Sequence, residues 1–417
     1  MMQNKKNIFI WSLFDFANTA FYVIVLTVGY PLFFKEVITQ NSPNSDLLWG
    51  LSFSISMLIV AMISPLLGAI ADFGAGKKGF LLFFTLLCIL ATASLFFTGP
   101  SMIFLGILLL VLANIGFEAG LVFYDAFLPE IATERSYGRV SGYGFAMGYV
   151  GSLITLMIVF PLYQAGFVES NLFNVRLSFI IAALLFLLFS LPLFIFLPDK
   201  QLKFKFEVKF FSEGYSRLKT TFKQFKEYKN IAIFLAAYFL FIDGVNTVII
   251  FSSIFARESL QMDLGEIIVL FAIVQTAAIF GSAIFGIISD HLGHKRTLII
   301  TLIIWIGIVV SAYFVQDKII FFIVAGVAGI SLGSSQSISR SFMTSLTPPE
   351  KKTEFFGFYS FFGKASAILG PLMFGIISSM IDQRTAIISI AFFFIAGILI
   401  LTKVKDPVVV KEKFTVS

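Results

Sequence analysis

Long hydrophobic runs separated by short polar segments make up nearly the whole chain. About 20 apolar residues suffice for a helix to cross the hydrocarbon core of a bilayer. The longest polar stretch, residues 199–229, divides the runs into six and six. We therefore predict twelve transmembrane helices, at residues 8–34, 47–71, 79–98, 101–127, 139–165, 173–197, 230–255, 265–289, 297–316, 318–345, 355–380 and 385–402.

Internal repetition indicates that the two sets of six spans are copies of one unit. The sequence DFANT at residues 15–19 of the first span is echoed by DGVNT at 243–247 of the seventh. A loop pattern also returns: Gly68 and Asp72 precede Lys77 and Lys78, as Gly286 and Asp290 precede Lys295 and Arg296. Each loop follows the second span of its half. We expect an N-terminal half at 1–198, a linker at 199–229, a C-terminal half at 230–403 and a tail at 404–417.

Composition and charge define the class of protein and its orientation. The chain is 58% hydrophobic and 13% charged, with a mean hydropathy of +0.95, which indicates an all-α polytopic membrane protein. Most of the 30 basic residues lie at the N-terminus, in loops after even-numbered spans and at the C-terminus. The positive-inside rule then places both termini in the cytoplasm. The net charge of +6 therefore requires no nucleic acid as a partner.

The linker and the small residues predict two kinds of packing surface. Within residues 203–229, aromatic and leucine side chains recur at helical spacing among lysines, which predicts a basic amphipathic helix on the anionic inner leaflet. A helix that binds a partner protein is the alternative. Glycines at residues 142–151 and 357–370, in the fifth span of each half, allow helices to approach closely and slide.

Asp72 and Asp290 are expected to hold a gate. A carboxylate at the C-terminal end of a helix opposes that helix's dipole, so each needs a basic side chain or another helix's N-terminus as a partner. The glycine four residues earlier permits close backbone contact. We interpret the two loops as interhelical latches, although solvated loops with turn glycines would show the same residues. The candidate gating residues are Gly68, Asp72, Lys77, Lys78, Gly286, Asp290, Lys295 and Arg296.

Polar groups inside the spans are the candidates for a transport pathway, because burying charge in a bilayer is costly. Asn114, Glu118 and Asp125 share one helical face. Glu118 and Asp15 are candidates for proton coupling, whereas a static salt bridge of Glu118 with Lys364 or Arg340 is the structural alternative. Arg340 is expected either to snorkel to the cytoplasmic side or to bind an anionic group of the substrate. The full set is Asp15, Asn18, Asn114, Glu118, Tyr124, Asp125, Gln164, Asp243, Asn246, Gln275, Gln336, Arg340 and Lys364.

Motifs for enzymatic or metal chemistry are not evident in the sequence. His291 and His294 lie in a basic loop without further His or Cys, so they are interpreted as solvated, and no metal or cofactor is expected. The segment from Gly357 to Lys364 departs from a phosphate-binding loop in spacing and lacks Ser or Thr after the lysine. We therefore expect no enzyme and no ATP-driven pump.

Three stretches resemble a known family. They are WSLFDFANTAF at residues 11–21, FYDAFLPEIA at 123–132 and residues 333–375, which contain GSSQSISRSFMTSLTPPE. Together with the doubled loop, they resemble the major facilitator superfamily and, within it, the Atg22-like branch of vacuole effluxers and UMF1 proteins. Asp125 departs from the asparagine expected in that branch. The resemblance implies two six-helix halves with pseudo-two-fold symmetry, whose first, fourth, seventh and tenth spans line a central cavity.

The function implied by the resemblance is secondary active transport of a small polar solute. Amino-acid efflux with proton or other ion coupling is the expected activity, by a monomer in a prokaryotic inner membrane. Two alternatives remain open on the same fold. One is a receptor or scaffold that does not transport and uses the linker to recruit a partner. The other is a lipid translocase, for which a lateral opening and a cavity with an apolar side would be the distinguishing features.

Overall fold

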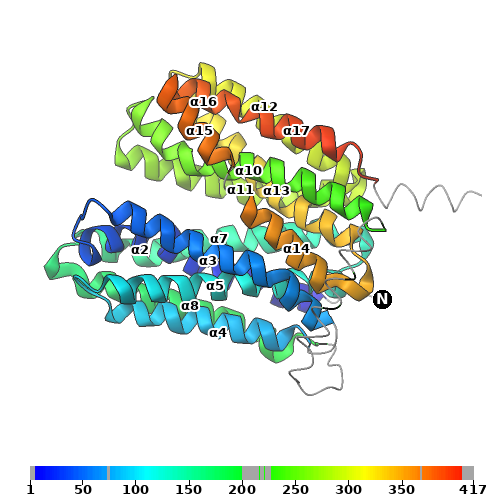
Figure 1. The fold of residues 1–417 in the computed structure, drawn as a ribbon, viewed down its shortest axis with the longest axis horizontal. Helices are drawn as coiled ribbons and strands as arrows, with labels where there is room; N and C mark the ends of the chain where they lie inside the picture. Colours follow the sequence, from blue (N-terminus) through cyan, green and yellow to red (C-terminus); the bar gives the residue numbers. More distant parts are fainter. Residues whose placement is uncertain are drawn as a thin grey trace, which may run out of the picture.

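The computed structural model describes residues 5–72, 76–199, 216, 220, 227–366 and 369–405, and it is all-helical (Figure 1). Within these residues, 12 helices are long and apolar enough to cross a membrane, and they coincide with the twelve predicted spans. The protein is therefore a multi-pass integral membrane protein, as the hydrophobic pattern predicted. The linker helix expected at 203–229 lies largely outside the described residues.

The N-terminal half contains the first six spans. The first span changes helix type along its length: α1 (Lys5–Phe21) continues through a π-helical segment (Tyr22–Val28), α2 (Gly29–Phe33) and a second π-helical segment (Phe34–Ile38). The short helix α6 (Leu128–Ile131) connects the fourth and fifth spans. The other five spans are α3 (Ser45–Ile70), α4 (Lys78–Ser94), α5 (Ile103–Asp125), α7 (Tyr137–Tyr163) and α8 (Leu172–Phe196).

The C-terminal half repeats this arrangement, with its last two spans each divided into two helices. The eleventh span consists of α14 (Lys352–Ala365) and α15 (Leu369–Met380), and the twelfth of α16 (Gln383–Ser389) and α17 (Ala391–Leu401). The preceding four spans are α10 (Lys229–Glu258), α11 (Leu264–Leu292), α12 (His294–Phe314) and α13 (Lys318–Leu346).

In each half, a lysine at the start of one helix binds carbonyl oxygens just after the last span of that half. Lys78, at the start of α4, donates from Nζ to the carbonyl oxygen of Leu197 just after α8, at 2.7 Å. Lys295, at the start of α12, donates to the carbonyl oxygens of Thr402 and Val404 just after α17, at 2.6 Å each. A cation at a helix C-terminus binds the last free carbonyls and stabilises the helix dipole. The two halves thus share this kind of contact, although Lys78 aligns with Arg296, and Lys295 with Lys77, in the repeat.

The two halves lie side by side and meet mainly through α7 against α11 and α13, and through α3 against α14 (Figure 1). We call the end of the bundle that holds Lys5, Asp72 and Lys351 the basic end. It lies at the right of Figure 1, near the label N. At this end the halves are in backbone contact, because Gly357 lies against Ser64 and Gly142 lies against Ser282. Side chains at these glycines would separate the helices.

Candidate functional site

A buried arginine joins the two halves at the floor of the bundle's central cavity. Arg340 of α13 is 2% exposed, and its Nη1 lies 3.2 Å from Asp15 Oδ2 and 3.1 Å from Asp125 Oδ1. Its Nε and Nη2 donate to Ser141 Oγ at 3.0 Å and to the Ser141 carbonyl at 2.9 Å. One C-terminal side chain therefore binds α1, α5 and α7 of the N-terminal half.

Aromatic rings enclose this guanidinium. Its central carbon lies 4.0 Å from the ring centroid of Phe145 and 4.7 Å from that of Trp11, within cation–π range. Trp11 Nε1 donates to the Tyr124 carbonyl at 3.1 Å, and the Tyr124 hydroxyl donates to the Trp11 carbonyl at 3.0 Å. The expectation that Arg340 snorkels to the surface is wrong, because paired carboxylates and stacked rings hold it inside the bundle.

A second ion pair crosses between the halves beside the first. Lys364 Nζ of α14 lies 2.7 Å from Glu118 Oε2 of α5, and their side chains are 15% and 10% exposed. This is one of the two pairings that the sequence analysis considered for Glu118. Because charge is costly inside a bilayer, the pair stabilises both partners in this conformation.

Two clasps close the basic end, and each joins an aspartate at the end of one helix to the N-terminus of a helix in the other half. Asp290 accepts hydrogen bonds from the backbone N–H groups of Gly138 at 2.7 Å and Arg139 at 3.1 Å, and from Arg139 Nε at 2.8 Å. Asp72 Oδ2 accepts the Glu354 N–H at 2.9 Å. Both aspartates thus have the kind of partner that the dipole argument required.

The glycines before the clasps lie where backbones touch. A Cβ on Gly286 would lie 2.6 Å from the Gly138 carbonyl oxygen, and one on Gly68 would overlap the Thr353 carbonyl. Burial raises the pKa of the Asp72 carboxyl, and the hydrogen bond from the Glu354 N–H offsets part of this shift. The closed state therefore holds a proton on Asp72 more tightly than a solvated carboxylate would, so this residue favours closure at low pH and loses that effect as pH rises through its raised pKa.

Most of the basic residues expected in the latches stay within their own half. Lys77 Nζ lies 2.6 Å from Glu130 Oε1 and 2.8 Å from the Ala126 carbonyl oxygen, which ties the first loop to the end of α5. Lys78 and Lys295 bind the sixth and twelfth spans, as described above, and Arg296 is exposed. The contacts between halves described here use the aspartates and glycines of the two loops.

Replacing Asp290 with asparagine should open the basic end more than replacing Asp72. Asp290 has a charged partner, the Arg139 guanidinium, whereas the hydrogen bonds of Asp72 come from the uncharged Glu354 N–H and Thr353. Bonds to charged groups are worth about 1.5–3 kcal/mol, roughly twice those between neutral groups. Spin labels at the exposed residues Arg135 and Glu350, in a chain with Cys88 replaced by alanine, report the separation of the halves.

The control for that prediction is Asp382→Asn. Asp382 caps α16 by accepting the Thr385 N–H at 2.8 Å, a contact within one half. This variant should leave the label distance unchanged. A longer distance in Asp72→Asn than in Asp290→Asn would contradict the ranking.

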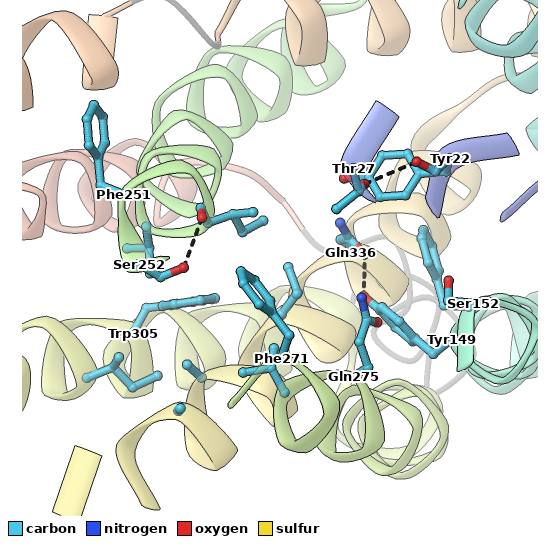
Figure 2. Close-up of a pocket in the computed structure, with 18 of the residues that line it drawn as sticks. Tyr22, Thr27, Tyr149, Ser152, Phe251, Ser252, Phe271, Gln275, Trp305 and Gln336 are labelled. Atoms are coloured by element: carbon cyan, nitrogen blue, oxygen red, sulfur yellow. Dashed lines mark hydrogen bonds between the residues drawn. The ribbon is translucent and has the colours of Figure 1, made fainter. Parts of the chain in front are cut away.

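The halves enclose a cavity of about 390 Å³ above Arg340. Its lining runs from Arg340, near the end of α13, to Phe321 in the first turn of α13, so the cavity extends toward the end opposite the basic end. Figure 2 shows Tyr149 of α7 and Gln336 of α13 facing each other across it, with the hydroxyl donating to Oε1 at 2.6 Å. The polar lining includes Asp15, Asn18, Tyr22, Thr27, Glu118, Asp125, Tyr149, Ser152, Gln275, Gln336 and Arg340.

The two walls of the cavity differ in polarity. The charged carboxylates Asp15, Glu118 and Asp125 all come from the N-terminal half. The C-terminal half contributes a largely apolar wall from α10, α11, α12, α13, α15 and α16, in which Phe251, Phe271 and Trp305 are visible in Figure 2. A molecule bound here would meet hydrogen-bonding groups on one side and rings and aliphatic chains on the other.

Three expected pathway residues lie away from the cavity, and a fourth reaches it only through its partner. Asn114 donates to Ser56 Oγ at 2.7 Å and joins α5 to α3. Asp243 is fully buried and accepts the Gly370 N–H at 2.8 Å. This N–H lies in the first turn of α15, where no intrahelical acceptor is available, so it attracts the carboxylate. Asn246 is half-buried outside the lining, and Lys364 acts on the cavity wall through Glu118.

Several lining residues were missed at the level of sequence. Tyr22 begins the π-helical segment of the first span, and Tyr149 lies among the glycines of the fifth. Gln275 was identified because it is a polar group within a span. Tyr149 and Ser152 are also polar groups within a span, and a search that covered every hydroxyl side chain would have included them. The apolar lining carried no signal, since phenylalanine faces lipid, core and cavity alike. Within the described residues, no cluster of three His, Cys, Asp or Glu that could hold a metal was found.

Solved structures resemble this chain in fold, and known relatives resemble it in sequence. The structure of XylE, a proton:xylose symporter of the major facilitator superfamily, superposes with a TM-score of 0.74 at 13% identity and covers 96% of each chain. FucP, in an outward conformation, gives 0.74 at 14% identity over 97% of this chain and 100% of its own. The chain therefore has the fold of the major facilitator superfamily structures, with a cavity between its two halves.

The family within this class follows from the sequence match. The family model described as "Vacuole effluxer Atg22 like" matches residues 48–407. An uncharacterized MFS-type transporter, YxiO of Bacillus subtilis, is 33% identical over 404 residues, which are 95% of this chain and 94% of YxiO. Autophagy-related protein 22 of Yarrowia lipolytica is 24% identical over 78% of this chain and 70% of its own. The chain belongs to the Atg22-like vacuole effluxer family, and the resemblance noted in the sequence is confirmed.

Proposed function

We propose that this protein is a secondary active transporter that exports a small amphipathic solute, of the amino-acid class, by alternating access. The observation that carries the proposal is the cavity between the halves, with charged groups at its floor and clasps closing the basic end beneath it. A cavity of about 390 Å³ falls within the usual range for small-molecule sites, roughly 300–1,000 Å³.

The two walls of the cavity suit the two ends of such a solute. The carboxylates of α1 and α5 and the amide of Gln336 can bind an ammonium or another polar group, while the apolar wall contacts the remainder. Export agrees with the description of the family as effluxers. The positive-inside pattern supports a cytoplasmic basic end, so this conformation would face outward. We assign the protein to a prokaryotic inner membrane because its loops are compact and its matched relative YxiO is bacterial.

The test is uptake and counterflow of a panel of labelled amino acids in proteoliposomes, with and without an imposed pH gradient. Glu118→Gln should lower gradient-driven accumulation by at least about tenfold, because it leaves the Lys364 ammonium buried without an anion. If no amino acid exchanges in folded wild-type protein, the solute class is wrong.

A double replacement tests whether Glu118 acts only through its ion pair. Glu118→Gln combined with Lys364→Met removes both charges and should recover folding. If it also recovers gradient-driven accumulation, Glu118 is a structural partner of Lys364. If only downhill exchange recovers, Glu118 takes part in coupling. The exposed residue Arg296, replaced with alanine, serves as the control.

The apolar wall gives specific support to a second candidate, lipid translocation. A lateral opening and a cavity with an apolar side would distinguish a lipid translocase, and the C-terminal half provides the apolar side. Reconstitution with fluorescent phospholipids in the inner leaflet tests this candidate. Transfer of the label to the outer leaflet by wild type, together with a blank amino-acid panel, would establish it in place of solute export.

A further inference from the structure

The charges at the cavity floor do not balance. Two cations, Arg340 and Lys364, face three carboxylates, those of Asp15, Asp125 and Glu118. Glu118 and Lys364 pair one to one, so the surplus negative charge lies where two aspartates share a single guanidinium. An uncompensated charge in the interior of a membrane protein is costly, and a carboxylate in such a place is commonly neutralised by a proton.

The distances make it unfavourable for both aspartates beside Arg340 to be ionised at once. Asp15 Oδ2 and Asp125 Oδ1 lie within 3.2 Å of the same nitrogen, Nη1 of Arg340, so the two oxygens are at most about 6.4 Å apart. Like charges at this separation resist simultaneous ionisation. One proton on the pair would leave one carboxylate for Arg340 and would bring the five charged groups to neutrality.

Asp125 is the better placed of the two to take that proton. Its side chain is 17% exposed and lines the cavity, whereas that of Asp15 is 9% exposed. It is also the last residue of α5, where the helix dipole disfavours a negative charge. Asp15 has a second donor, Asn18 Nδ2, at 3.5 Å from its Oδ1.

We propose that Asp125 is the proton-binding residue of this transporter and that protonation of its carboxylate neutralises the cavity floor and stabilises the closed basic end. The inference rests on the proposed function and names its coupling ion and site. A proton entering from the open cavity binds Asp125, which leaves Asp15 as the one ionised carboxylate paired with Arg340. Arg340 then keeps only Asp15 and Ser141 as its partners in the N-terminal half among the polar contacts described above.

Other titratable groups face this site and must be separated from it. Lys364 and Tyr359 of α14, Tyr238 of α10 and Tyr124 of α5 are close enough to interact electrostatically with Asp125 or its partners. The clasp aspartates Asp72 and Asp290 lie at the same end of the bundle. Asp72 acts with the same sign, because its buried carboxyl also favours the closed state at low pH.

The test needs no substrate, so its failure is distinct from failure of the transport assignment. The full chain in lipid nanodiscs carries spin labels at Arg135 and Glu350, with Cys88 replaced by alanine, and the label distance is measured between pH 5 and pH 9. We expect acid to shift wild type toward the shorter distance. Asp125→Asn should show the shorter distance throughout, with the pH-dependent shift reduced at least about fivefold.

Matched variants separate Asp125 from its neighbours. Asp15→Asn removes the competing carboxylate and should leave Asp125 ionised to lower pH, which moves the midpoint down without abolishing the shift. Asp243→Asn, whose carboxylate lies away from the cavity, should keep the wild-type midpoint. Asp125→Glu should restore a titration if the role is proton binding, and circular dichroism and gel filtration identify any variant that is misfolded.

The inference is overturned if Asp125→Asn retains the wild-type shift and midpoint, or if Asp243→Asn abolishes the shift. A response lost only in Asp72→Asn would assign the pH sensitivity to the clasp and would also overturn it. Proteoliposomes loaded with a pH dye add a second measure. Asp125→Asn should not couple solute exchange to proton movement.

Discussion

Replacing Arg340 with alanine should reduce transport by at least about a hundredfold and shift the protein away from the closed basic end. The substitution leaves two buried carboxylates without their cation and removes the donors to Ser141. Breaking a buried pair by removing one partner costs roughly 3–5 kcal/mol. Counterflow of the solute found in the panel, together with the label distance at the basic end, measures both effects.

Arg340→Lys should not retain wild-type transport. Arg340 binds two carboxylates through Nη1 and Ser141 through Nε and Nη2, and it packs its flat face against Phe145 and Trp11, which a single ammonium cannot reproduce. The control is Arg296→Ala at an exposed position. Transport within twofold of wild type in Arg340→Lys would show that charge alone suffices and would contradict the bonding argument.

Adding side chains where the backbones touch should have the second large effect. In Gly286→Val, the new Cβ lies 2.6 Å from the Gly138 carbonyl oxygen and 3.1 Å from the Gly142 Cα, so neither neighbour can yield as a flexible side chain would. Overpacking costs about 1–3 kcal/mol. The closed state should therefore lose roughly tenfold to a hundredfold in population, and the spin-label distances should report an open basic end.

A glycine in open space provides the control for this substitution. Gly307 of α12 has no atom within 4 Å of an added Cβ, so Gly307→Ala should behave as wild type. Gly68→Val, at the equivalent position of the other half, should reproduce the opening. A wild-type distance distribution in both Gly286→Val and Gly68→Val would show that close backbone contact is dispensable for closure.

The spans and the repeat could be predicted from the sequence because both are local properties. Length and hydropathy locate a helix in a bilayer, and the doubled loop placed Asp72 and Asp290 at helix ends that needed partners. For the partners of these aspartates, the sequence indicated only the kind of group required, a basic side chain or a helix N-terminus. Choosing the N-termini of α14 and α7 requires knowing which helices of opposite halves are neighbours.

The sequence did not show which face of each helix is turned toward the cavity, the core or the lipid. Phenylalanine packs equally well against lipid, in the core and in the cavity. The 54 phenylalanines therefore did not indicate which of them line the apolar wall. For Arg340, snorkelling and binding of an anionic substrate group both stayed open, because its distance from the helix end allowed either. Its true partners, Asp15 and Asp125, are more than 200 positions away in the chain. Asp243 binds an N–H in the first turn of α15, a helix that begins there only because the eleventh span is divided into two helices. Hydropathy did not reveal that division.

The two clasps also constrain how the protein can open. Each half supplies one aspartate and one helix N-terminus, so the contacts form two points of attachment on separate helix pairs, α11 with α7 and α3 with α14. If one clasp released alone, the other would act as a pivot and the halves would swing sideways about it. A straight passage to the basic end therefore requires both to release together, so mutations in either clasp should alter one shared opening rate.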